Sequence, residues 1–175
     1  MLATTRALVS VEEYLSTVYE SDCDYVDGEV VERNLGESAH SELQLELAAW
    51  LASEAKRHRF RGFTEQRVQT LPRHFRIPDL CVVLGRVRVP PILRQPPFLC
   101  IEIMSSEDRL SRMLKRLDEY IAFGVPFNWL IDPFEKAGYS YSRSGLQLAE
   151  DGLLRTTQPD LVLDLNERFR AIEEE

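Results

Sequence analysis

The sequence predicts an α/β fold in which a central mixed β-sheet is flanked by helices. Apolar residues recur at helical spacing in two segments, at about 38–58 and 108–123. Two short apolar runs, FRIPDLCVVL at 75–84 and FLCIEIMS at 98–105, have the length of buried strands. Together with the second helical segment they give the order strand, loop, strand, helix, which is typical of helices packed on a sheet.

The N-terminal part predicts a short helix and a hairpin before the first long helix. SVEE at 10–13 has the Ser-x-x-Glu form of a capping box and opens a helix that runs to about Tyr19. DYVDGEVVER at 24–33 contains two β-like runs around Asp27-Gly28, a dipeptide suited to a tight hairpin turn. The long helix at 38–58 then carries on one face Leu43, Leu47, Trp50, Leu51 and Ala55.

The middle of the chain predicts three strands and the second long helix. The strands are expected at 63–70, 79–84 and 98–103, with the Pro-rich loop GRVRVPPILRQPP between the last two. The helix at about 108–123 ends before Gly124, and its expected apolar stripe consists of Leu110, Leu114, Leu117 and Ile121.

The C-terminal part predicts a further strand and a hairpin. FNWLID at 127–132 is the strand, the hairpin lies at about 138–150, and a short segment at 161–172 closes the chain. The chain has 175 residues, of which 44% are hydrophobic, which is enough for one core. We therefore expect a single domain over residues 1–175.

The cysteines and the N-terminus indicate a cytoplasmic protein. Cys23, Cys81 and Cys100 show no CxxC spacing, and the last two lie in apolar strands where a reduced thiol packs as a small hydrophobe. No continuous apolar segment resembles a signal peptide or approaches the length of a membrane span.

Charge is distributed unevenly along the chain. The formal net charge of −8 argues against a nucleic-acid binder when it is taken alone. Residues 56–116, however, hold 14 Lys/Arg and 5 Asp/Glu, a net charge of +9. This segment predicts contact with nucleic acid through phosphates, chiefly at 57–76 and 86–94, although a solvated charged face explains it equally well.

Two carboxylates stand inside the apolar runs. Asp79 begins one predicted strand and Glu102 lies within the next. A buried carboxylate is costly unless it meets a cation, and Mg²⁺ commonly takes one or two protein carboxylates. The pair therefore predicts a metal site, with Mg²⁺ or Mn²⁺ as the ion and phosphodiester hydrolysis as the chemistry.

The chain resembles the Uma-two-like putative restriction endonuclease family, a branch of the PD-(D/E)XK nuclease superfamily. The resemblance covers nearly the whole length and rests on five segments in the family's order: DYVDGEVVE, GESAHSELQLELAAWL, IPDLCVV, CIEIMSSEDRL and YIAFGVPFNWLIDP. It implies a restriction-endonuclease-like core and a metal-dependent nuclease site, with Asp79 and Glu102 as the acidic ligands.

The sequence departs from the superfamily pattern at the lysine. The resemblance places a lysine two residues after the strand glutamate, where this chain has Met104. Relatives carry it instead on the next helix, four residues before the tyrosine that matches Tyr120, and that position is Arg116. Lys115 is one residue away and lies on the solvent side of the helix relative to the expected apolar stripe. It is therefore explained equally well as a surface lysine or as the assisting residue. Arginine offsets charge but does not act as a base.

Two other residues match the family segments. Glu29 follows the hairpin turn and either approaches the metal or a bound water, or is a solvated strand carboxylate. His40 lies near a helix N-terminus, where a cation is not favoured, so a neutral imidazole in contact with a phosphate or a site carboxylate is expected.

These observations predict a Mg²⁺-dependent or Mn²⁺-dependent DNA endonuclease. Asp79 and Glu102 bind the metal in this hypothesis, and Lys115 or Arg116 assists. The alternative is a nucleic-acid-binding module that has kept the fold without turnover, which the absence of the strand lysine favours. A homodimer is expected because two sites related by a two-fold axis can cut both strands of a duplex. GVPFNWLID and the closing segment are its expected apolar surface.

Overall fold

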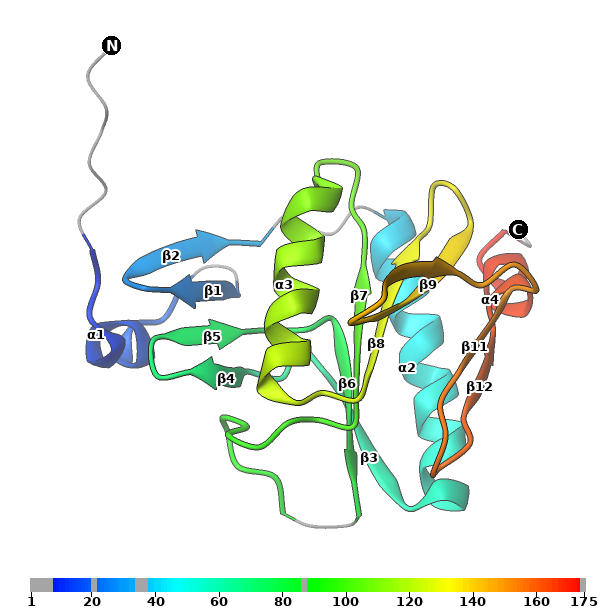
Figure 1. The fold of residues 1–175 in the computed structure, drawn as a ribbon, viewed down its shortest axis with the longest axis horizontal. Coiled ribbons are helices and arrows are strands. Elements are labelled where there is room, and N and C mark those ends of the chain that lie inside the picture. The colour runs from blue at the N-terminus through cyan, green and yellow to red at the C-terminus, as the bar shows by residue number, and fades with distance from the viewer. Residues whose placement is uncertain (1–7, 20–21, 34–37, 86–87, 174–175) are drawn as a thin grey trace.

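The computed structural model describes residues 8–19, 22–33, 38–85 and 88–173, and the predicted α/β fold is confirmed. A mixed six-stranded sheet has the strand order β10-β9-β8-β7-β6-β3 (Figure 1). Neighbouring strands are antiparallel except for β7 and β8, which are parallel and joined through helix α3. The bounds are β3 Phe60–Thr64, β6 Leu80–Leu84, β7 Leu99–Ile103, β8 Phe127–Asp132, β9 Ala137–Ser142 and β10 Gly145–Leu148.

The two long helices cover opposite faces of this sheet. Helix α2 spans Ser38–His58 and helix α3 spans Leu110–Phe123, close to the predicted ranges. Successive strand residues point to opposite faces, so one set packs under α2 and the alternate set under α3. The first set includes Leu80, Val82, Leu99, Ile101 and Ile103, and the second includes Cys81, Cys100 and Leu130.

A second, four-stranded sheet has the order β2-β1-β5-β4 and carries the N-terminal helix α1, Val11–Ser16. The Ser10 side chain accepts a hydrogen bond from the Glu13 N–H at 3.1 Å, as the capping box predicts. Buried Tyr14, Tyr25 and Phe75 pack where the helix meets the sheet. The strand bounds are β1 Cys23–Val26, β2 Glu29–Glu32, β4 Val68–Leu71 and β5 His74–Arg76.

The single strand predicted at 63–70 is wrong. The chain leaves the six-stranded sheet after Thr64 and enters the four-stranded sheet at Val68. Glu65 has a positive φ of 51°, which breaks the extended backbone between the two strands. The four consecutive polar residues Thr64, Glu65, Gln66 and Arg67 interrupt the apolar pattern at the break, and the prediction of one continuous strand overlooked this signal.

The expected dimer surface is also wrong. Strand β8 lies between β7 and β9, and Trp129, Leu130 and Ile131 are buried in the core. The closing segment is buried too, because Leu163, Leu165 and Phe169 join the cluster beneath α2. Its elements are β11 Leu153–Arg155, β12 Val162–Asp164 and α4 Leu165–Ala171. The homodimer stays a prediction, but its interface is not the surface that was expected.

Among the helices in the described ranges, none combines the length and the apolar character that a membrane span requires.

Candidate active site

Asp79 and Glu102 lie at facing positions on neighbouring strands. The antiparallel register of β6 and β7 pairs Leu80 with Ile101, and each carboxylate stands one residue beyond that pair. Asp79 is in phase with Cys81, and Glu102 with Cys100, so both side chains point to the α3 face of the sheet. Their side chains are 1% and 0% exposed. The fold therefore brings two buried carboxylates together under one helix.

Three donors surround the Asp79 carboxylate. Arg33, directly after β2, forms an ion pair with Oδ1, and the His40 Nε2 lies 3.4 Å from the same oxygen. The Ile103 backbone N–H donates to Oδ2 at 2.7 Å. Burial by itself would raise the pKa of Asp79, but the His40 hydrogen bond and the Arg33 charge outweigh it and lower the pKa below its usual value. Asp79 is thus held as an anion.

Glu102 is held by two side chains from α3. Arg116 Nη1 lies 2.7 Å from Oε2, and the Tyr120 hydroxyl donates to Oε1 at 2.6 Å. Burial is the largest effect on the Glu102 pKa and raises it, and the nearby Asp79 charge raises it further, while Arg116 only partly offsets these effects. Arg116 and Tyr120 are one helical turn apart, which places both on the face of α3 that meets the sheet.

A third buried carboxylate, Asp24 on β1, was not anticipated from the sequence. Its Oδ2 lies 3.0 Å from Arg116 Nη2 and 3.0 Å from Arg76 Nη1. Its Oδ1 accepts the Ile77 N–H at 3.0 Å. The signal was available, because Asp24 stands between apolar residues in CDYV just as Glu102 does in LCIEI. Asp24 links the four-stranded sheet to the helix that holds Glu102.

Arg33 and Arg76 were likewise missed as site residues. Arg76 also pairs with Glu119 of α3, at 2.7 Å, so it joins β5 to that helix. The sequence predicts Arg33 only as part of a hairpin and Arg76 only as part of a basic surface. An arginine next to an apolar strand forms no recognisable sequence motif, so neither residue was identified as part of a site. Their partners become evident only when β1, β2 and β5 lie over the end of β6.

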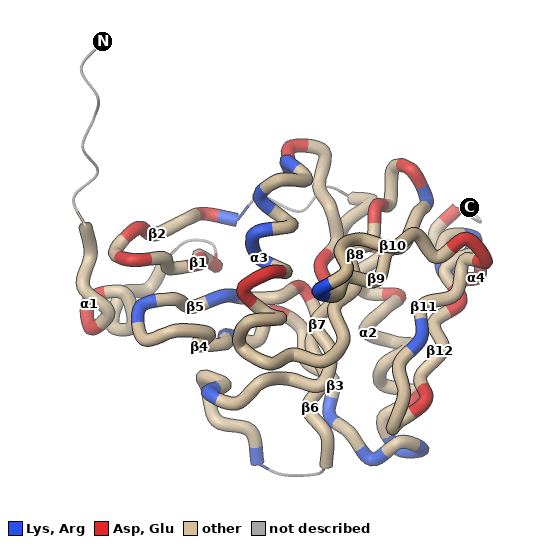
Figure 2. The backbone as a smooth tube through the Cα atoms, viewed as in Figure 1, with Lys and Arg blue, Asp and Glu red and all other residues tan. Residues whose placement is uncertain are grey.

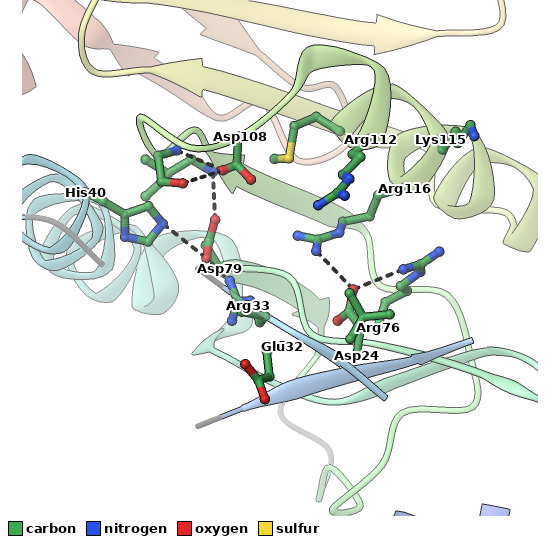
Figure 3. A pocket seen from close by; sticks show the side chains of 14 residues that line it. Asp24, Glu32, Arg33, His40, Arg76, Asp79, Asp108, Arg112, Lys115 and Arg116 are labelled. Carbon is green, nitrogen blue, oxygen red and sulfur yellow. Dashed lines mark hydrogen bonds and ion pairs between the residues drawn. The ribbon is translucent and has the colours of Figure 1, made fainter. Parts of the chain in front are cut away.

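A cavity of about 210 Å³ opens above these groups (Figure 3). Asp79, Asp24, Arg33 and His40 line its base and sides, whereas Glu102 lies beneath Arg116 and is not a lining residue. Figure 3 shows Arg112 pointing into the cavity and Lys115 at its margin, both from α3. The cavity is therefore open to a ligand on the side where cationic side chains are exposed.

The predicted site residues fall into two groups. Asp79, Glu102, Arg116 and His40 come together, and Lys115 lines only the exposed margin of the cavity. Glu29 is exposed at the turn end of β2 and does not line the cavity, which agrees with the alternative of a solvated strand carboxylate. The hairpin reaches the site with its other end, through Val31, Glu32 and Arg33.

His40 contacts a site carboxylate, and this contact acts on its pKa in the direction opposite to the expected neutral imidazole. Burial lowers the pKa of His40, yet the hydrogen bond with Asp79 and the Asp79 charge outweigh burial and raise it. The carboxylate at 3.4 Å acts more strongly than the unfavourable end of the helix dipole.

This shift predicts a pH-dependent contribution to stability. Because the folded-state pKa of His40 is raised, its contribution is fully present below the unfolded pKa, about 6.5, and is lost as pH rises through the folded pKa. We expect His40→Gln to lower the free energy of unfolding more at about pH 5.5 than at about pH 9, measured in urea. In an Asp79→Asn background the same replacement should show no such pH dependence.

The acidic trio, Asp24, Asp79 and Glu102, is balanced by a guanidinium trio, Arg33, Arg76 and Arg116. In residues 8–19, 22–33, 38–85 and 88–173 no group of three or more His, Cys, Asp or Glu is placed to hold a metal ion. Two carboxylates are nevertheless what Mg²⁺ commonly takes from a protein. Asp79 Oδ2 and both Glu102 oxygens each accept one protein donor and have a second lone-pair site. These carboxylate oxygens are the type of ligand atom that a hard divalent ion prefers.

Two groups of basic residues of the +9 segment lie at separate ends of the molecule, and Figure 2 shows further Lys and Arg elsewhere, for example along β5. Arg112, Lys115 and Arg116 lie along α3 at the cavity. Arg57, Arg59 and Arg61 lie where α2 ends and β3 begins, and β3 runs antiparallel to β6 from Leu84 back to Leu80. At about 3.3 Å per strand residue, Arg61 is roughly 15 Å along the sheet from Asp79. Contact with nucleic acid chiefly through residues 57–76 and 86–94 stays a prediction.

A buried acidic pair on adjacent strands lies beneath a cation-lined cavity, which is the arrangement expected from the resemblance to restriction-endonuclease-like nucleases. The Uma2 family, described as "Putative restriction endonuclease", matches residues 11–171. The chain belongs to this family.

The fold is also similar to a solved structure. That structure is the crystal structure of "a putative nuclease belonging to DUF820" from Anabaena variabilis ATCC 29413, with a TM-score of 0.80 and 22% sequence identity. The similarity covers 93% of this chain and 98% of that one, and it is a likeness of fold. No curated protein matches the sequence.

Proposed function

We propose that the chain is a DNA endonuclease that hydrolyses phosphodiester bonds with Mg²⁺ or Mn²⁺. Family membership supports the nuclease activity. The observation that carries the proposal is the placement of Asp79 and Glu102 at facing, fully buried positions below the cavity. Each carboxylate of the pair is balanced by an arginine, and a cluster of buried charges with perturbed pKa values beside an open cavity is typical of a functional site.

In the proposed site, Asp79 and Glu102 would hold the metal ion, and a bound divalent ion would supply Lewis-acid activation of water and of the scissile phosphate. Arg116 orients the Glu102 carboxylate from 2.7 Å and offsets negative charge as it develops. Tyr120 keeps Glu102 in place through its hydroxyl, whose pKa burial raises far above its usual range, so it remains a donor. His40 keeps the Asp79 carboxylate in place through the contact of its Nε2 with Oδ1.

Substrate phosphates are proposed to bind at the cavity margin. Arg112 and Lys115 lie three residues apart on α3, so they share one side of the helix, and both are exposed. A guanidinium and an ammonium on this side suit two neighbouring phosphates of a nucleic-acid strand. DNA is the proposed substrate because the family is one of restriction endonucleases.

The function is tested by incubating supercoiled plasmid with purified protein and Mg²⁺ or Mn²⁺. We expect nicked or linear DNA, and we expect EDTA to abolish its formation because the acidic pair has then lost its ion. DNA that stays intact with every divalent ion tried would contradict the proposal.

The two basic ends predict different salt responses. Arg112→Ala together with Lys115→Ala should weaken DNA binding and reduce the slope of log affinity against log salt by about two, since each phosphate contact contributes a slope of about 0.9. The matched control replaces Arg57 and Arg59, at the other end of the sheet, and should change the slope less. Fluorescence anisotropy with a short duplex over a range of salt concentrations measures both.

A second candidate is a nucleic-acid-binding module without turnover. The observation that favours it is that all ion pairs of Asp79 and Glu102 among the described residues come from arginines and His40, and none from a lysine. Met104, at the usual lysine position, packs with the core cluster beneath α3. Binding of DNA with no cleavage under any metal condition would favour this candidate.

We further propose that residues 1–175 act as one nuclease-like domain, that the working form is a homodimer, and that the protein is cytoplasmic. Two sites related by a two-fold axis could cut both strands of a duplex, and light scattering at micromolar concentration would distinguish dimer from monomer. Cys81 and Cys100, facing each other across β6 and β7, are buried thiols, which suits a reducing compartment.

A further inference from the structure

Arg33 occupies the space beside Asp79 that a metal ion would need. Its side chain is 14% exposed, and its guanidinium forms an ion pair with Asp79 Oδ1. His40 contacts the same oxygen, so the two lone-pair sites of Oδ1 are both used. A divalent ion that approached Asp79 here would meet a fixed positive charge and a carboxylate whose charge is already balanced.

The three arginines of the guanidinium trio are not equivalent. Arg116 bridges Glu102 and Asp24, and Arg76 bridges Asp24 and Glu119, so each is anchored by two buried or half-buried carboxylates. Among the described residues, the ion pair of Arg33 is made with Asp79 alone. Arg33 is the residue directly after β2, and its side chain lines the cavity. Arg33 is therefore the guanidinium that can leave with the least disruption.

We propose that Arg33 is the resident counter-ion of Asp79 and that a divalent metal ion binds by displacing it; the proposal rests on the proposed function for the presence of a metal. Arg33 is a positioning residue, since it acts through Asp79. It keeps the Asp79 carboxylate balanced and oriented when no ion is present, and it lowers the affinity of the site for the ion. Removing its charge should tighten metal binding.

The test is calorimetric titration of the full-length protein with Mn²⁺ alone, without DNA. Replacing Arg33 with Gln should tighten Mn²⁺ binding by about tenfold or more, the factor that one charge-assisted hydrogen bond represents. Arg33→Lys keeps a charge but loses the forked geometry and should bind Mn²⁺ with an affinity between the two. Arg112→Gln is the matched control, because it removes an equal charge from the cavity without touching Asp79, and should give a smaller change.

A thermal unfolding series gives a second readout. Without metal, Arg33→Gln should unfold at a lower temperature than wild type, and saturating Mn²⁺ should raise its midpoint by more than it raises that of wild type. Equal or weaker Mn²⁺ binding by folded Arg33→Gln would overturn the proposal, as would an equal gain in Arg112→Gln. If Arg33→Gln does not fold, Arg33→Lys alone must bind Mn²⁺ more tightly than wild type, or the proposal fails.

Failure of this proposal differs from failure of the proposed function. Tighter Mn²⁺ binding by Arg33→Gln, with no plasmid cleavage by any variant, would support the role of Arg33 and refute the nuclease. Plasmid cleavage with unchanged Mn²⁺ affinity across the Arg33 variants would do the reverse.

Discussion

Replacing Asp79 with Asn or Glu102 with Gln is expected to reduce plasmid nicking by at least about a hundredfold, because each amide removes a negative metal ligand while keeping the side-chain shape. Both carboxylates are buried and already hydrogen-bonded, so the amide also misorients the donors around it. Gel quantification of nicked and linear plasmid over time measures the loss.

Glu29→Gln is the matched control for these variants. It makes the same chemical change at an exposed carboxylate near the hairpin turn, away from the cavity, and should leave the nicking rate within about twofold, as is usual for surface substitutions. Full activity in Asp79→Asn or Glu102→Gln would show that the acidic pair is not the metal site.

Replacing Arg116 with Ala is expected to lower the free energy of unfolding by about 3–5 kcal/mol, the usual effect of leaving buried ion partners without a cation. Two carboxylates, Asp24 and Glu102, would lose their shared guanidinium, and both are 0% exposed. Urea unfolding followed by circular dichroism measures the change.

Lys115→Ala is the neighbouring control on the same helix. Lys115 is exposed and pairs with neither carboxylate, so its replacement should change stability by no more than about 0.5 kcal/mol. Arg116→Lys keeps a positive charge, so nicking by its folded form separates the role of charge from that of the fold. If Lys115→Ala abolished nicking while Arg116→Lys did not affect it, the lysine would be the assisting residue.

The spacing of apolar residues predicted most of the helices and strands, but it placed the buried face of helix α3 wrongly. The stripe on α3 was expected to contain Leu110 and Leu114, yet Leu110 is 45% exposed and the buried residues are Met113, Leu117 and Tyr120. The reason is that half-buried Arg116 and fully buried Tyr120 face the sheet as partners of Glu102. A search for apolar residues counts both side chains as polar, so the predicted buried stripe was centred on a different face of the helix.

The site was predictable in part for a related reason. A carboxylate within a buried strand stands out against its neighbours, which identified Asp79 and Glu102 from the sequence. Arg33 and Arg76 are ordinary arginines in ordinary surroundings until the second sheet lies over β6. Their positions depend on contacts between strands that are distant in the sequence, such as the β1–β5 pairing, and no local pattern encodes these contacts.

The contact between Asp24 and Arg116 joins residues 92 positions apart, and the contact between Arg33 and Asp79 spans 46. Contacts of such separation form late, because closing a long loop costs entropy that only the finished packing recovers. During synthesis, α3 emerges after the four-stranded sheet and β6, and β8 follows it. A chain that has not yet released α3 therefore has no assembled pocket, and the proposed capacity to cut DNA would arise only once that helix has left the ribosome.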